Sequence, residues 1–184
     1  MRSLILSSVL GTVLFTALSS LADPGPRVGK PAPSFSLRDR EGTLVSLADF
    51  AYSGPERRGR PKKVVLFDFF RTDCAPCRQS IPRLVELHRK FNGRPVQFML
   101  IALLEEDEGQ EKLDRFVQQA RLPFLVLTDP YGMAAKRYVQ KKGGAYEIPS
   151  CFVVDRGGVL RRRFQRITPV EQPELTRLLQ ELAQ

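Results

Sequence analysis

The stretch VVLFDFFRTDCAPCR, residues 64–78, decides the fold. Residues 64–70 are apolar except for Asp68, and a short run of β-forming residues is typical of a buried strand. After Cys74, apolar side chains recur at helical spacing. Pro76 suits the first turn of a helix, because a backbone N–H at that position would have no hydrogen-bond partner within the helix. The stretch therefore predicts a strand that leads directly into a helix, with two cysteines at the junction.

The two cysteines at this junction have the spacing of a reactive pair. Cys74 and Cys77 are three residues apart and can close a small disulfide ring. A helix N-terminus offers free N–H groups and a partial positive charge, and both favour a thiolate over a thiol. Such a placement lowers the pKa of a cysteine from about 8.5 toward neutral or below. We therefore expect Cys74 to be the nucleophile and Cys77, one turn deeper, the resolving thiol.

Two other interpretations of the cysteine pair stay open. A CxxC pair is half of a zinc site, but only Cys151 and His88 remain to supply the other half. The pair could also form an inert disulfide in an exported protein. We expect Cys151 to be a buried core thiol, with a third redox role as the alternative, and His88 to be a partly exposed residue of the helix.

The composition is that of one globular domain. The chain has 184 residues, of which 42% are hydrophobic and 27% charged. Lysine and arginine number 29 against 20 acidic residues, so the formal charge is +9 and the surface is basic. Three cysteines are too few for a disulfide scaffold, and a single histidine excludes a His-rich metal site. We expect neither a metal nor a cofactor.

Residues 1–22 have the features of a secretory signal peptide. Arg2 gives a basic start, residues 4–21 are mostly apolar, and Ser20-Leu21-Ala22 ends the run in a small-x-small pattern. An uncleaved anchor formed by residues 4–21 is the alternative, because the run is near the lower limit for crossing a bilayer. In both cases we expect an extracytoplasmic protein, either in the periplasm or secreted.

The rest of the chain predicts an α/β domain. Residues 23–33, with four prolines and two glycines, read as an extended tether, and residues 34–184 as the domain. Alternating and continuous apolar runs predict a hairpin at 35–47 and strands at 64–70, 96–104, 124–127, 151–154 and 159–164. Helical spacing predicts helices at 74–91, 108–121, 131–140 and 174–183. In this order, parallel strands come first and an antiparallel hairpin last.

A basic stretch separates the first hairpin from the first buried strand. Residues 52–63 are polar and contain Pro and Gly, and their basic side chains fall within residues 57–63. A solvated loop is the simplest interpretation. The alternative is a docking patch for an acidic partner or for lipid head groups, which would allow membrane association through residues 57–63.

Several segments around the cysteine pair resemble the TlpA-like group of exported thioredoxin-fold proteins, in the AhpC/TSA-redoxin superfamily. The resemblance covers about residues 28–183 and is carried by residues 28–35, 65–70, Cys74 to Cys77, Pro82, 146–150 and 155–160. Residues 108–127 match the central insertion of the group. The resemblance implies a thioredoxin-like fold: a central mixed sheet flanked by helices, with an N-terminal hairpin and a central αβ insertion.

The resemblance also implies roles for further residues. Asp68, six residues before Cys74, matches a buried acid that takes a proton from the second cysteine through water. Pro149 matches a cis-proline that faces the CxxC motif and presents the backbone of Ile148 to an extended substrate. Ala75 and Pro76 would contact that substrate too. The alternatives are a structural Asp68 bonded to backbone and an ordinary trans turn at Pro149.

The chain departs from the group at two positions near the cysteines. Asp73 stands where the group usually has Trp, and Ser80 stands where many TlpA-like reductases have Glu. We expect three neighbouring charges to tune the nucleophile: Asp73 disfavours the Cys74 thiolate, whereas Arg71 and Arg78 favour it. These effects partly cancel.

Together these features predict a thiol-disulfide oxidoreductase that reduces protein disulfides through Cys74 and Cys77. We expect protein disulfides or dithiols as substrates, a membrane thiol donor as the source of electrons, and a monomer. A peroxiredoxin-like peroxidase is the first alternative, although Arg71 stands where that family has Thr before its reactive cysteine. A non-enzymatic module that binds nucleic acid or anionic membrane is the second, and export argues against nucleic acid.

Overall fold

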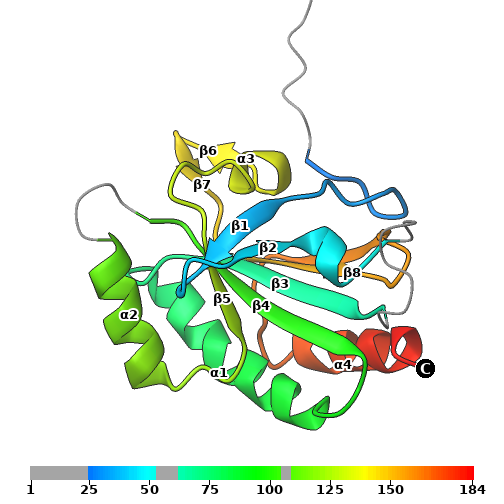
Figure 1. Cartoon of the computed structure of the whole chain (residues 1–184). Coiled ribbons are helices and arrows are strands. Elements are labelled where there is room, and N and C mark those ends of the chain that lie inside the picture. The colour runs from blue at the N-terminus through cyan, green and yellow to red at the C-terminus, as the bar shows by residue number, and fades with distance from the viewer. Residues whose placement is uncertain (1–24, 53–61, 105–108) are drawn as a thin grey trace, which may run out of the picture.

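The strand predicted at residues 64–70 lies inside the sheet as β3 (Val64–Phe70), and every one of its residues is buried. The structure, a computed structural model, describes residues 25–52, 62–104 and 109–184. Within these residues seven strands form one mixed sheet (Figure 1). The other strands of the sheet are β1 (Ser36–Asp39), β2 (Leu44–Ser46), β4 (Val96–Ala102), β5 (Leu125–Thr128), β8 (Ser150–Val154) and β9 (Leu160–Phe164).

The strand order confirms the expected α/β topology. The order is β2-β1-β5-β4-β3-β8-β9, with β3, β4 and β5 parallel and the outer strands antiparallel. The first predicted hairpin is β1–β2, and the last is β8–β9. The carboxyl ends of β3, β4 and β5 therefore meet at one edge of the sheet, where α/β proteins place their sites.

Helices cover both faces of the sheet. One face packs against α1 (Ala75–Lys90), α2 (Gly109–Ala120) and α4 (Glu171–Leu182), and the other against the short helices η1 (Leu47–Asp49) and α3 (Ala135–Tyr138). Successive side chains of β3 alternate between the two cores, as a strand requires: Leu66 and Phe70 lie in the first, and Phe67 and Phe69 in the second.

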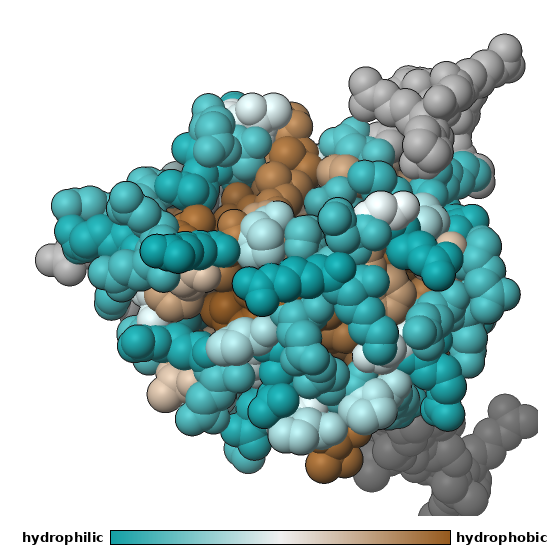
Figure 2. All heavy atoms as spheres, turned by 90° about the horizontal axis from the view of Figure 1, so that it is seen from below, coloured by the Kyte–Doolittle hydropathy of each residue, from teal (hydrophilic) through white to brown (hydrophobic). Residues whose placement is uncertain are grey.

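The surface of the side with α1, α2 and α4 is mostly hydrophilic (Figure 2). The apolar stripes of these helices face the sheet instead, with Leu84 and Leu87 of α1 and Leu175 and Leu179 of α4 all buried. Burial of these stripes holds the helices in place, since apolar area removed from water contributes about 25 cal/mol per Å². This packing fixes the start of α1 relative to the end of β3.

The predicted helix at residues 131–140 is wrong in length, because only Ala135–Tyr138 is α-helical. The carboxylate of Asp129 accepts hydrogen bonds from the backbone N–H groups of Met133, Ala134 and Ala135, at 2.8 to 3.0 Å, and these bonds shape the preceding residues as a turn. After α3 the chain enters a small two-stranded sheet, β6 (Lys141–Lys142) and β7 (Ala145–Tyr146), which the sequence analysis did not predict.

The Pro-rich stretch read as a tether is attached to the sheet in its second part. The Gly29 N–H donates to the Leu160 carbonyl at 2.7 Å, and the Ala32 N–H donates to the Gly158 carbonyl at 2.9 Å. The signal peptide or anchor expected at residues 1–22 and most of the basic stretch at 57–63 lie outside the described residues. Among the helices that the structure describes, none is long and apolar enough to cross a membrane.

Candidate active site

The cysteine pair lies where β3 gives way to α1. Cys74 is the N-cap of α1, and the backbone N–H of Cys77 donates to its Sγ at 3.2 Å. The two residues form a disulfide, with their Cα atoms 5.3 Å apart. Cys74 is half-buried, whereas Cys77 is only 1% exposed. The structure thus holds the oxidised pair, with one sulfur at the surface and the other behind it.

Asp68 lies on the face of β3 that α1 covers. Its side chain is 1% exposed, and its Oδ1 has no hydrogen-bond partner among the described residues. Burial raises the pKa of Asp68 to about 8, and a backbone hydrogen bond from Ser150 acts in the opposite direction. The Asp68 carboxyl can therefore gain and lose a proton near neutral pH. Cys77 is buried in the core on this same face.

Arg71 and Asp73 form a two-point ion pair beside Cys74. The Arg71 Nε lies 3.0 Å from Asp73 Oδ1, and its second nitrogen lies 2.7 Å from Oδ2. The hydrogen bond from Arg71 lowers the pKa of Asp73. Arg78, the third predicted tuning residue, is exposed on α1 and lines a separate depression between α1 and α2. The structure therefore joins two of the three charges and places the third on another surface.

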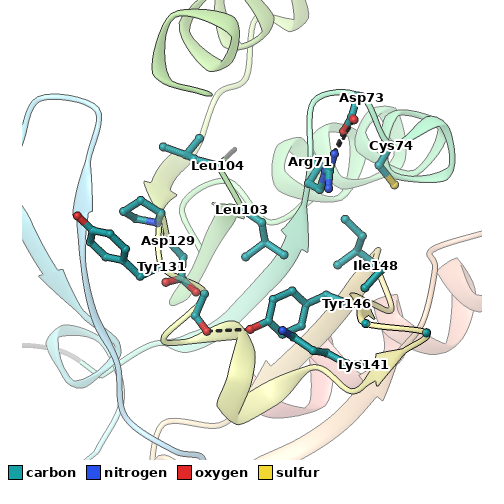
Figure 3. Close-up of a pocket in the computed structure, with 15 residues that line it drawn as sticks. Arg71, Asp73, Cys74, Leu103, Leu104, Asp129, Tyr131, Lys141, Tyr146 and Ile148 are labelled. Atoms are coloured by element: carbon teal, nitrogen blue, oxygen red, sulfur yellow. Dashed lines mark hydrogen bonds and ion pairs between the residues drawn. The ribbon is translucent and has the colours of Figure 1, made fainter. Parts of the chain in front are cut away.

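The peptide bond between Ile148 and Pro149 is cis, as the resemblance implied. Ile148 and Cys74 line the same open cavity of about 710 Å³ (Figure 3). Ala75 and Pro76, the other predicted substrate contacts, are exposed at the start of α1. The structure thus places the half-buried sulfur of Cys74 and the residue before the cis-proline on one concave surface.

Much of the lining of this cavity consists of residues that no sequence motif pointed to. Leu103 and Leu104 follow β4, Tyr131 follows β5, and Lys141 and Tyr146 come from the β6–β7 hairpin. The Tyr146 hydroxyl donates to the Gly132 carbonyl at 3.2 Å, which ties the hairpin to the turn before α3. The adjacent glycines at 143 and 144, both with positive φ, were the signal that could have revealed the hairpin.

The remaining cysteine and the histidine lie away from the cavity lining. Cys151 is fully buried on β8 with a free thiol, which confirms its prediction as a core residue. Burial, and secondarily the nearby Asp68, raises the pKa of Cys151. His88 is partly exposed, as predicted, and packs edge-on against Phe98 and Phe124.

Comparisons with known proteins agree with this geometry. Residues 28–163 match the AhpC/TSA family. Thiol-disulfide oxidoreductase ResA of Bacillus cereus is 30% identical over 171 residues, which are 93% of this chain and 88% of that protein. A crystal structure from Chlorobium tepidum, assigned as thiol:disulfide interchange protein DsbE, has a TM-score of 0.70 at 25% identity and covers 87% of this chain and 100% of that one. The chain therefore belongs to the AhpC/TSA family, as a TlpA-like thiol-disulfide oxidoreductase related to ResA.

Proposed function

We propose that the protein reduces disulfide bonds of extracytoplasmic proteins, with Cys74 as the attacking thiolate and Cys77 as the resolving thiol. The observation that carries this proposal is the difference in exposure between the two sulfurs. Cys74 is half-buried at the N-terminus of α1, whereas Cys77 is buried one turn behind it. A substrate disulfide can reach the first sulfur and not the second.

The reaction starts from the reduced pair. The Cys74 thiolate attacks one sulfur of the substrate disulfide, that S–S bond breaks, and the other substrate cysteine leaves as a thiolate. A mixed disulfide now joins Cys74 to the substrate. Cys77 then loses its proton and attacks the Cys74 sulfur, which releases the second substrate thiolate and closes the Cys74–Cys77 disulfide. Two electrons have passed from the enzyme to the substrate, and both substrate thiolates take up protons.

Asp68 is suited to accept the proton from Cys77 in the second step. Its carboxyl is buried on the face that α1 covers, and burial raises its pKa to about 8. A base with a pKa near the working pH is the most effective proton acceptor, because it is both available and strong enough. A water molecule would bridge Asp68 and Cys77. Ile148, before the cis-proline, would pair through its backbone with the extended substrate.

Repeated turnover requires a dithiol donor that reduces the Cys74–Cys77 disulfide again. A membrane protein with such a dithiol fits an exported enzyme, because the thiol-reducing systems of the cytoplasm do not reach that compartment. The signal-like residues 1–22 support the extracytoplasmic location, with residues 4–21 as either a cleaved leader or an anchor. Pro76 between the cysteines resembles reducing members of the group, and we propose that the enzyme acts as a monomer.

Trapping of the mixed disulfide tests the assignment of the two cysteines. The reduced Cys77→Ser variant should accumulate a covalent adduct with insulin or another protein that contains a disulfide. Mass spectrometry would detect this adduct, and dithiothreitol should release it. The Cys74→Ser variant and the double variant should form none and should lose insulin reduction. An adduct on Cys77 in Cys74→Ser would reverse the roles. Rapid dithiothreitol-dependent consumption of hydrogen peroxide by the wild type would favour the peroxidase alternative instead.

A further inference from the structure

The charges that line the active-site cavity are not equally free to bind a substrate. Arg71 and Asp73 neutralise each other in their two-point ion pair. Asp129 is 2% exposed, and both its oxygens accept backbone N–H groups. These three charges are therefore already committed within the protein. Lys141 is the fourth charged residue of the lining, and no carboxylate lies within ion-pair distance of it among the described residues.

Lys141 is exposed, and its ammonium lies over an aromatic ring of the cavity lining. Its Nζ lies 4.5 Å from the centre of the Tyr146 ring, a distance at which the ring face attracts a cation. Figure 3 shows the ammonium beside this ring, with Ile148 between Tyr146 and Cys74. Lys142, the next residue of β6, does not line the cavity, because successive side chains of a strand point to opposite faces.

The cavity therefore combines an apolar part with a cationic end. Leu103, Leu104 and Ile148 give apolar surface, and Lys141 adds an ammonium that desolvation by a bound chain would leave without a counterion. A volume of about 710 Å³ accommodates several residues of an extended peptide. Charge complementarity then selects a peptide segment that brings a carboxylate to Lys141.

We propose that Lys141 binds a carboxylate of the substrate, so that the enzyme prefers disulfides whose cysteine is followed or preceded within a few residues by Asp or Glu. This inference rests on the proposed disulfide reductase function. It assigns Lys141 as a specificity-determining residue and gives the substrate class as acidic, extended segments of oxidised proteins. It adds nothing to the chemistry at Cys74.

Paired peptide substrates test this inference. Each peptide has one intramolecular disulfide and differs from its partner only by Glu in place of Gln, placed in turn at each of the nearest flanking positions. At one or more positions the wild type should reduce the Glu peptide about two- to fivefold faster in kcat/KM, as an exposed ion pair allows. This ratio should fall toward one as salt is raised. Lys141→Glu should invert the ratio.

Lys142→Glu is the matched control, because it makes the same change of net charge one residue away. It should leave the Glu/Gln ratio as in the wild type. Equal ratios in Lys141→Glu and Lys142→Glu would show that only long-range attraction acts, and would overturn the inference. A loss in Lys141→Glu that is the same for both peptides would show that Lys141 does not distinguish the two substrates, and would overturn the inference as well.

A neutral small disulfide separates the two levels of the proposal. The wild type should reduce hydroxyethyl disulfide, and Cys74→Ser should not. If the wild type fails with this compound and with both peptides, the reductase function itself is refuted. If it reduces all of them with no preference for Glu at any position, the reductase function stands and the role of Lys141 falls.

Discussion

Asp68 and Cys151 lie directly opposite each other in the antiparallel β3–β8 pair. Both side chains are buried, with exposed fractions of 1% and 0%. Both groups are acids whose charged form is stabilised by water. Burial removes this stabilisation and therefore raises the pKa of both groups. The core beneath α1 therefore contains a Cys151 thiol that stays protonated at neutral pH and an Asp68 carboxyl that is mainly protonated but close enough to its pKa to keep a carboxylate fraction.

The Asp68 pKa predicts a pH dependence of stability. In the unfolded chain the carboxyl releases its proton near pH 4, whereas in the folded protein it keeps the proton up to about pH 8. Between these values the folded state binds more protons, so the free energy of unfolding falls as pH rises. We expect a loss of about 2–4 kcal/mol from pH 5 to pH 8 in urea titrations of the oxidised protein. Asp68→Asn should remove most of this slope.

Cys151→Ala is the control for this measurement. Burial raises the pKa of Cys151 from a value that already lies above this pH range, so its thiol stays protonated from pH 5 to pH 8 in both states. The variant should lose stability through its cavity but keep the wild-type slope. If Asp68→Asn shows the full wild-type slope, Asp68 does not have a raised pKa in the folded protein.

The same carboxyl predicts a selective kinetic defect. Asp68→Asn cannot accept the Cys77 proton, so closure of the enzyme disulfide should slow about 100-fold or more. Attack by Cys74 does not use this proton and should change far less. Rapid acid quenching followed by mass spectrometry would then show the mixed disulfide accumulating in the variant. Equal slowing of both steps would mean that Asp68 acts only through the structure of the core.

The Arg71–Asp73 ion pair predicts opposite effects of two neighbouring substitutions. Asp73→Asn removes an anion beside Cys74 and should raise the thiolate fraction, whereas Arg71→Gln removes a cation and should lower it. Both charges are near solvent, so we expect changes of about two- to fivefold in the rate of iodoacetamide alkylation at pH 6. The double variant should return close to the wild-type rate. Arg78→Gln, on a separate surface, should change the rate less than Arg71→Gln.

The sequence was informative where the signal is local. The apolar run at residues 64–70, the cysteine spacing and Pro76 lie within fifteen consecutive positions, and they define the strand, the helix start and the reactive pair. The last hairpin is local too: Asp155 Oδ1 accepts from the backbone N–H groups of Gly157 and Val159, both at 2.9 Å. In these places the interactions that fix the structure join residues close together in the sequence, so the pattern along the chain predicts the structure.

The cavity could not be predicted because its lining comes from separate segments. Leu103 follows β4, Tyr131 follows β5 and Lys141 lies in β6, so these residues meet only after β3, β4 and β5 pair. The charges beside Cys74 illustrate another limit. From the sequence, Arg71 and Asp73 are independent influences of opposite sign on Cys74, but in the structure their side chains form one ion pair whose net effect depends on geometry.

Gly158 predicts a stability effect that depends on one close approach. It has φ +83°, and an added Cβ would overlap the ring of Tyr52, whose hydroxyl donates to the Ala32 carbonyl. Gly42 has the same φ of +83° but open space around it, so it is a matched control. Gly42→Ala should cost about 1 kcal/mol from the backbone alone, and Gly158→Ala about 1–3 kcal/mol more, because the Tyr52 ring must move. Urea midpoints measure both, and in the Gly158→Ala background Tyr52→Ala should cost less than in the wild type. Equal penalties at the two glycines would show that the ring yields freely and does not hold the N-terminal segment against the sheet.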